Sequence, residues 1–130
     1  PGAAGWQLSN APVLSMAVHK VSLDIFAKAG MPQLLKKAKQ LNAYLNFVIE
    51  EAMKNNPALE LNIITPPAPE RGCQISVLTG NNGKALFDFL TQNGVIADWR
   101  NPNVIRMAPV PLYNSFEDIY RFGQILQSFK

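Results

Sequence analysis

The sequence predicts an α+β fold in which helices pack on one face of a small, mainly antiparallel sheet. Helical and strand patterns follow one another in the order helix, helix, strand, strand, helix, strand, strand, helix. The chain has 130 residues, of which 48% are hydrophobic and 16% charged, enough apolar residues to build a core. It contains no internal repeat, low-complexity segment or convincing linker. We therefore expect residues 1–130 to form a single domain.

The first helix is expected to begin near Ala11 and Pro12, with Asn10 able to cap it, and to end at Gly30. Apolar residues recur at helical spacing and give this helix one apolar stripe, which comprises Leu14, Val18, Val21 and Ile25. The second helix should run from about Pro32 to Lys54. Its buried stripe would comprise Leu34, Ala38, Leu41, Leu45, Val48 and Ala52, widened by Leu35 and Ile49.

The rest of the chain alternates short strands with two further helices. Strands are predicted at Leu61–Thr65, Cys73–Leu78, Val95–Trp99 and Val104–Ala108, and helices at Gly83–Gln92 and Phe116–Phe129. Cys73, Ile75 and Val77 should share one face of their strand. The last two strands should form an antiparallel pair, and the final helix should turn Ile119, Phe122, Leu126 and Phe129 inward.

One arginine stands out in the stretch from Asp98 to Asp118. The turn residues Asn101, Pro102 and Asn103 come before the strand that carries Arg106, and prolines follow it. Ser115 and Asp118 have the Ser-x-x-Asp spacing of a helix-capping box. An arginine held from both sides is suited to grip a carboxylate with its planar fork. On pattern alone, however, a structural ion pair with a nearby Asp or Glu is the more common role.

Composition narrows the class of protein. The net charge is only +3, and Lys36, Lys37 and Lys39 lack interleaved aromatic residues, so we interpret them as a solvated helix face and expect no nucleic-acid binding. A single cysteine excludes an internal disulfide and fits a cytoplasmic setting. No apolar run is long enough for a membrane span, and the N-terminus lacks a signal-peptide pattern.

Three other candidate sites are weak. The Gly80–Lys84 loop has two residues between its glycines, where a phosphate-binding loop needs four, and Ala85 replaces the required Ser or Thr. His19 and Cys73 could form a nucleophilic pair, but Cys73 is more simply a small buried hydrophobe. No spacing of ligands indicates a metal site, so none is expected.

Three stretches together resemble one family. From Arg100 to Phe116 the chain contains Arg-Asn-Pro-Asn-Val-Ile-Arg and Ala-Pro-Val-Pro-Leu-Tyr-Asn-Ser-Phe, which closely resemble the C-terminal region of kynureninases. Trp6 to Pro12 and Asn62 to Gln74 resemble further parts of the same family. Kynureninases are pyridoxal-phosphate enzymes of the aspartate aminotransferase fold type. The resemblance covers nearly the whole chain and implies the small C-terminal domain of such an enzyme.

The resemblance also implies roles for two residues. In kynureninases an arginine at the position of Arg106 grips the α-carboxylate of the substrate, and an asparagine in the stretch matching Asn10 lies near its aromatic ring. Here Ala11 separates Asn10 from Pro12, which departs slightly from the family pattern. Trp6 could line the same pocket or lie on an exposed surface. The parent enzyme would hydrolyse L-kynurenine, or its 3-hydroxy form, to the anthranilate and L-alanine in tryptophan catabolism and NAD biosynthesis.

The same resemblance places the catalytic and cofactor-binding groups elsewhere. The lysine that bonds pyridoxal 5'-phosphate and the phosphate cage would come from a large domain upstream, and no lysine here lies in a matching motif. We therefore expect no cofactor-binding and no catalytic residue in this chain, which by itself would be inactive and cut from a longer, homodimeric protein. The large domain would dock on an apolar patch that includes Trp6, Val13 and Met16. Arg106 should then point to solvent without a tight internal Asp or Glu partner.

Two alternatives stay open on the sequence. The chain could be the small domain of a related enzyme, such as a cysteine desulfurase or an aminotransferase, since the strand carrying Arg106 suits either. It could also be a stand-alone, non-enzymatic α+β binding module. The long motif from Arg100 to Phe116 favours kynureninase, and a cofactor-lysine motif upstream in the gene would eliminate the module.

Overall fold

The structure is a computed structural model that describes residues 2–130. The chain divides into two compact units where the sequence suggested one domain: residues up to Gln33 form the first, and Leu34–Lys130 the second. The long helix α2 (Met31–Asn55) begins in the first unit and continues through the boundary. Each unit is described below by itself.

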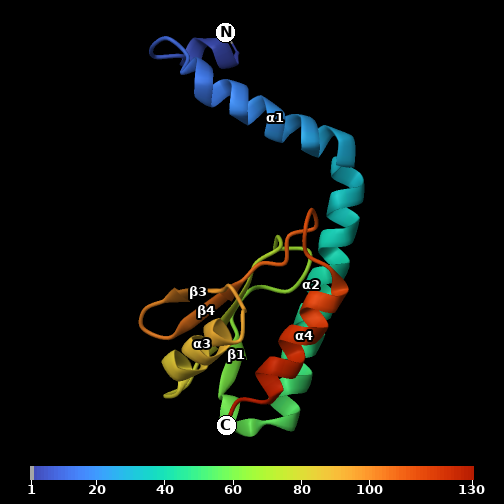
Figure 1. Cartoon of the computed structure of the whole chain (residues 1–130), viewed down its shortest axis with the longest axis vertical. Helices are drawn as coiled ribbons and strands as arrows, with labels where there is room; N and C mark the ends of the chain where they lie inside the picture. The colour runs from blue at the N-terminus through green and yellow to red at the C-terminus, as the bar shows by residue number, and fades with distance from the viewer. Residues whose placement is uncertain (1) are drawn as a thin grey trace. The chain divides into compact units, whose positions relative to one another are not determined.

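Besides the start of α2, the first unit contains a short 3₁₀ helix, η1 (Ala3–Trp6), and helix α1 (Val13–Ala29), drawn in blue in Figure 1. Helix α1 ends at Gly30, whose φ of 77° is one that glycine adopts readily. The expected cap by Asn10 is wrong, because Pro12 occupies the N-cap position and no side chain bonds to the first turn.

Helix α1 buries none of its residues, so its apolar stripe is exposed in this chain. Leu14 is 85% exposed and Val18 69%, while Val21 and Ile25 are more than half exposed. Apolar residues occur all round this helix rather than on one side, since Met16, Leu23 and Phe26 lie off the stripe. Charged residues lie among them, and Lys20 pairs with Asp24 on the surface of the helix.

In the second unit, α2 presents the predicted stripe to the core. Its buried residues are Leu34, Leu41, Asn42, Leu45, Val48, Ile49 and Ala52. Leu35, which was expected to widen the stripe, is 54% exposed. Asn42 is the unforeseen member: its Nδ2 donates a hydrogen bond of 3.0 Å to the carbonyl of Cys73, so its burial leaves that amide satisfied.

The sheet has four antiparallel strands in the order β1-β2-β4-β3. They are β1 (Leu61–Ile63), β2 (Ile75–Thr79), β3 (Asp98–Arg100) and β4 (Val104–Met107). Ile75, Val77 and Ile105 are buried on one face, as the alternation of the strands predicted. Cys73 lies before β2 rather than in it and is only half-buried.

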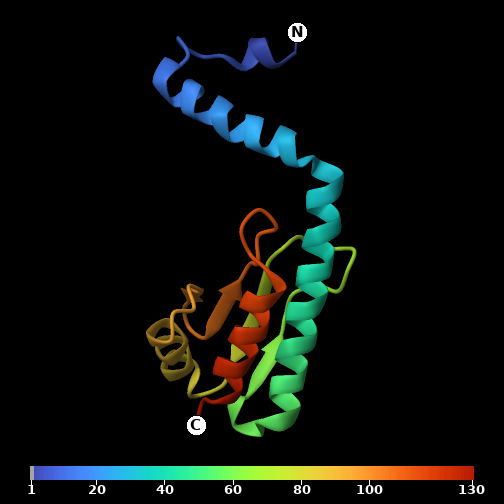
Figure 2. The same cartoon turned by 45° about the vertical axis from the view of Figure 1, so that its right-hand side comes forward.

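The remaining helices are α3 (Gly83–Gln92) and α4 (Phe116–Gln127), with a short 3₁₀ helix η2 at Pro57–Leu59. The expected capping box of α4 is confirmed: Ser115 and Asp118 exchange side-chain to backbone hydrogen bonds. Gly123 allows α4 to approach α2 closely, because a Cβ there would lie 2.5 Å from Cγ1 of Val48. The two helices run alongside each other in both views (Figures 1 and 2).

Side chains of α2, α3 and α4 form one core with the sheet. Residues buried together include Leu41, Leu45 and Ile49 of α2, Leu86 and Leu90 of α3, Ile119, Phe122 and Leu126 of α4, and Ile75, Val77 and Ile105 of the sheet. The α+β class is confirmed, with these three helices on one face of an antiparallel sheet. The opposite face of the sheet is left uncovered for polar side chains. No helix among residues 2–130 is both long and apolar enough to cross a membrane.

Candidate functional site

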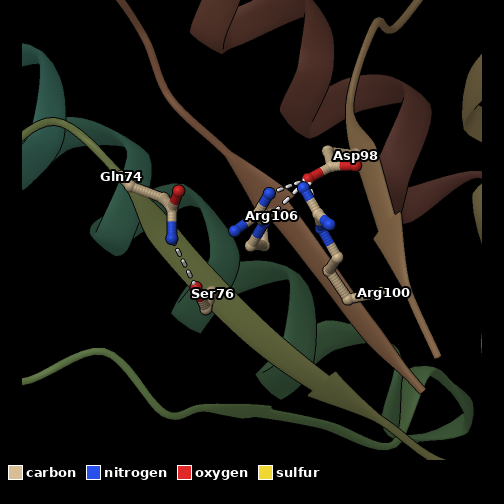
Figure 3. Close-up of polar contacts among 5 residues, drawn as sticks. All are labelled: Gln74, Ser76, Asp98, Arg100 and Arg106. Atoms are coloured by element: carbon tan, nitrogen blue, oxygen red, sulfur yellow. Dashed lines mark hydrogen bonds and ion pairs between the residues drawn. The ribbon is translucent and has the colours of Figure 1, made fainter. Parts of the chain in front are cut away.

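The uncovered face of the sheet carries a row of polar side chains from three strands (Figure 3). The strand register places Arg106 of β4 between Asp98 of β3 and Ser76 of β2. Arg106 follows the buried Ile105, and successive side chains of a strand point to opposite faces. This arginine therefore lies on the strand face turned away from the core.

Arg106 nevertheless has a close acidic partner. Its Nε donates a hydrogen bond of 2.7 Å to Oδ2 of Asp98, and its Nη2 donates to the same oxygen. The expectation that Arg106 would lack a tight internal Asp or Glu partner is wrong. The cause is the register, because residues directly opposite in an antiparallel pair have Cα atoms only about 4.5–5.5 Å apart.

A second arginine bonds to Asp98, so Arg106, Asp98 and Arg100 form one charged cluster. Arg100 Nε donates to the same Asp98 oxygen at 2.8 Å. Hydrogen bonds from Arg106 first, and then from Arg100, lower the pKa of Asp98 below its ordinary value, so this carboxylate stays ionised at neutral pH. Two guanidinium cations and one carboxylate anion leave the cluster with one net positive charge.

The cluster is accessible to solvent. The Arg106 side chain is 32% exposed and that of Asp98 46%. Arg106 uses only its Nε and Nη2 edge, and its Nη1 has no hydrogen-bond partner among residues 2–130. A guanidinium carries five N–H donors in a planar fork, so a second edge remains for another carboxylate.

Next to Arg106 lies a neutral polar pair, formed by Ser76 of β2 and Gln74 just before this strand. Gln74 Nε2 donates a hydrogen bond of 3.0 Å to Oγ of Ser76, which faces Arg106 in the register (Figure 3). The Ser76 hydroxyl accepts this bond, so its own proton is free to be donated. The row thus combines the Asp98, Arg100 and Arg106 cluster, which has one net positive charge, with neutral donors, a set that suits an anionic ligand.

A cavity of about 590 Å³ lies on the other side of the same strand end. It is lined by Met107, Ala108 and Pro109, which directly follow Arg106, and by core residues such as Leu45 and Phe122. Its lining in the described residues includes no lysine, histidine or cysteine.

The other predicted site residue, Asn10, lies in the first unit. It is exposed, and its side chain has no hydrogen-bond partner in the described part of the chain. Asn10 and Arg106 thus belong to different units, and the structure places each only within its own. Trp6, Val13 and Met16 are 85%, 75% and 52% exposed, which confirms the expectation that these three are uncovered in this chain.

The structure does not support the three weaker candidate sites. Lys84, in the loop that superficially resembled a phosphate site, forms an ion pair with Asp88 on its own helix. His19 belongs to the first unit and Cys73 to the second. No group of three or more His, Cys, Asp or Glu side chains that could hold a metal ion occurs in residues 2–130.

Comparison with known proteins decides the family. The family model for the kynureninase C-terminal domain matches residues 34–126. This chain belongs to the kynureninase family. The matched segment begins where the second compact unit begins, so the family's C-terminal domain corresponds to the part that carries the core and Arg106.

Individual kynureninases align over nearly the whole chain. The chain is 51% identical over 127 residues to the kynureninase of Flavobacterium psychrophilum and 52% identical over 127 residues to that of Flavobacterium johnsoniae. Each alignment covers 97% of this chain and 30% of the relative. The kynureninase of Xanthomonas campestris pv. campestris is 44% identical over 133 residues, covering 99% of this chain and 30% of the relative. The chain therefore spans about 30% of the length of the kynureninases it matches.

Sequence reasoning missed the partners of Arg106. Asp98 and Arg100 bracket the turn, and their distance from Arg106 along the chain does not reveal that all three side chains meet. A sequence signal did exist: in an antiparallel pair joined by a tight turn, Asp98, Arg100 and Arg106 occupy alternate positions that share one face.

Proposed function

We propose that this chain is the substrate-holding C-terminal part of an enzyme that hydrolyses L-kynurenine or 3-hydroxykynurenine to the corresponding anthranilate and L-alanine. This reaction would belong to tryptophan catabolism and supply NAD biosynthesis. The observation that carries the proposal is Arg106, which stands on the uncovered sheet face of the kynureninase C-terminal domain with one guanidinium edge free.

The free edge gives Arg106 a chemical role. The Nη1 and Nη2 donors can form two parallel hydrogen bonds to the two oxygens of an α-carboxylate. The net positive charge of the cluster favours the approach of this anion. Holding the carboxylate fixes one end of the substrate, and an amide such as Asn10 near the aromatic ring would fix the other. Fixing both ends aligns the bond to be broken with the reacting groups, which can lower the barrier by several kcal/mol.

The cofactor expected of the family, pyridoxal 5'-phosphate, needs a lysine for its Schiff base and a cage for its phosphate. The residues described here do not fit it. The cavity next to β4 is lined by no lysine, and Lys37 instead donates to the carbonyl of Pro111 at 2.8 Å. Lys20, Lys54 and Lys84 pair with acidic residues on their own helices. We therefore propose that the cofactor is held by residues outside this chain.

The partner that covers α1 follows from the same proposal. The relatives are more than three times as long as the aligned segment, since the alignments cover 30% of them. We propose that the apolar residues of α1, Val13 and Met16 among them, pack together with Trp6 against the large domain in the complete, cytoplasmic, homodimeric enzyme. Such packing would bury the helix that buries nothing in this chain.

Replacing Arg106 by lysine in the full-length enzyme tests the function. Lysine keeps the charge but loses the two-pronged geometry. Losing one charge-assisted hydrogen bond of about 1.5–3 kcal/mol predicts a drop of about ten- to hundredfold or more in kcat/KM for kynurenine. Anthranilate formation, followed by fluorescence, gives the rate, and the melting temperature reports on folding.

The matched control is Arg121→Lys, which alters an arginine that is 70% exposed and pairs with Glu117 on α4. This control should leave both the rate and the melting temperature unchanged. Asn10→Ala, measured in parallel, should raise KM without lowering the melting temperature. Unchanged kinetics together with a lowered melting temperature for Arg106→Lys would make Arg106 a structural residue and overturn the proposal.

A further inference from the structure

The Asp98–Arg106 pair has a geometry that separates the two edges of the guanidinium. Nε and Nη2 form the side edge, and both donate to the single oxygen Oδ2 of Asp98. Nη1 and the second N–H of Nη2 form the end edge, which has no partner among residues 2–130. Asp98 therefore occupies one edge completely and leaves the other intact for a ligand.

This ion pair is poorly placed to stabilise the fold. Asp98 is 46% exposed and Arg106 32%, and ion pairs at such exposure generally contribute little to stability. Neither side chain belongs to the core, which lies on the opposite face of the sheet. A long arginine side chain with no partner would, however, occupy many rotamers on this open face. The main physical effect of the pair is thus to restrict where the guanidinium points.

The backbone makes this restriction firm. Asp98 and Arg106 are direct register partners on adjacent strands, so both Cα atoms are held by the ladder of the sheet. Asp98 itself is held by a second bond of 2.8 Å from Arg100. Arg100 also offsets the negative charge of Asp98, which would otherwise repel an approaching carboxylate.

We propose that Asp98 is a positioning residue, which holds the side edge of Arg106 so that the end edge meets the α-carboxylate of an amino-acid substrate. This inference rests on the proposed function of Arg106. It assigns Asp98 no contact with the substrate. In this arrangement Asp98 and Arg100 together set the angle and the net charge of the carboxylate subsite.

The test uses the full-length enzyme with the variant Asp98→Asn, which keeps the size of the side chain but loses the charge. We expect kcat/KM for kynurenine to fall about tenfold, the loss of roughly one charge-assisted bond, with most of the change in KM. The discriminating readout is a pair of competitive inhibitors that differ only in the α-carboxylate. Asp98→Asn should weaken the binding of the carboxylate-bearing inhibitor about tenfold. The inhibition constant of its decarboxylated counterpart should change by less than about twofold.

Two further variants sharpen the test. In an Arg106→Lys background, Asp98→Asn should lower kcat/KM by less than about twofold, because the lysine has no guanidinium for Asp98 to position. Asp98→Glu keeps the charge and should give a KM between those of the unmodified enzyme and of Asp98→Asn. The matched control is Asp88→Asn, which removes the carboxylate of an ion pair with Lys84 on α3 at similar exposure and should leave the kinetics unchanged.

The outcomes separate this inference from the proposed function. If Arg106→Lys leaves kcat/KM unchanged, the function proposed for Arg106 fails and the positioning role fails with it. If Arg106→Lys impairs turnover but Asp98→Asn changes neither KM nor the ratio of the two inhibitors, only the positioning role is overturned. Equal weakening of both inhibitors by Asp98→Asn would mean that Asp98 supports the fold, and would also overturn it.

Discussion

Helix α1 should change from an exposed to a buried element when the chain is part of the complete enzyme. In this chain none of its residues is buried, and Leu14, Val18, Val21 and Ile25 are between 52% and 85% exposed. Full burial of a large aliphatic side chain is worth about 1.5–3 kcal/mol. Burying the remaining exposed area of these four side chains would therefore stabilise α1 by about 4–8 kcal/mol.

The perturbation is Leu14→Ala, made both in this chain and in the full-length protein. Leu14 is 85% exposed here, so in this chain the substitution should change stability by no more than about 0.5 kcal/mol. In the complete enzyme the same truncation should cost about 2–5 kcal/mol, the usual range for a buried leucine. Leu126→Ala is the matched control, because Leu126 is 2% exposed in the core and should cost about 2–5 kcal/mol in both proteins.

Amide hydrogen exchange, read by mass spectrometry on peptides from α1, measures the opening of this helix directly. A helix with no buried residue is marginally stable, so α1 should exchange rapidly in this chain. It should be strongly protected in the full-length enzyme, and Leu14→Ala should remove part of that protection. Equally rapid exchange of α1 in both proteins would show that nothing covers it, and would refute the proposed docking with the large domain.

Two further predictions concern the cofactor and acid stability. This chain can be titrated with pyridoxal phosphate, reduced with borohydride and analysed by peptide mapping. We expect no single lysine to be labelled saturably. One saturable site would contradict the assignment of the cofactor to residues outside the chain. The bond from the Ser115 backbone lowers the pKa of Asp118, so this cap contributes stability above the ordinary carboxyl pKa and loses it as the pH falls through the lowered pKa. The chain should therefore have a higher urea midpoint than Asp118→Asn at pH 7, and the two midpoints should converge at acid pH. A difference that does not change with pH would show that the carboxylate charge has no such role.

Much of the second unit could be predicted because its local signals agree with its packing. Helix α3 begins and ends at the predicted residues, Gly83 and Gln92, and the capping box fixes the start of α4. The apolar stripe of α2 was visible because a helix packed on one side needs apolar residues on that side only. Asn42 was missed, since its burial depends on a carbonyl 31 residues away in the chain.

The first unit was predicted less well for a physical reason. Periodicity shows that a helix has an apolar side, but it does not show which surface covers that side. Leu14, Val18, Val21 and Ile25 form the predicted apolar stripe, yet Met16 and Phe26 lie off it. Apolar residues on several sides of the helix fit burial from more than one direction. The predicted bounds of this helix were nearly right, since it begins at Val13 and is capped by Gly30, but Pro12 rather than Asn10 occupies the N-cap.

The case of Arg106 shows why the two roles weighed for it on the sequence do not exclude each other. Pattern alone favoured a structural ion pair, whereas the family resemblance favoured a grip on the substrate carboxylate. The structure supplies the ion pair with Asp98, but the pair uses only the Nε and Nη2 edge. A lysine has a single compact charge, so an aspartate paired with it would compete with any second anion. A guanidinium has two separate edges, so Arg106 can be fixed by one carboxylate while it binds another.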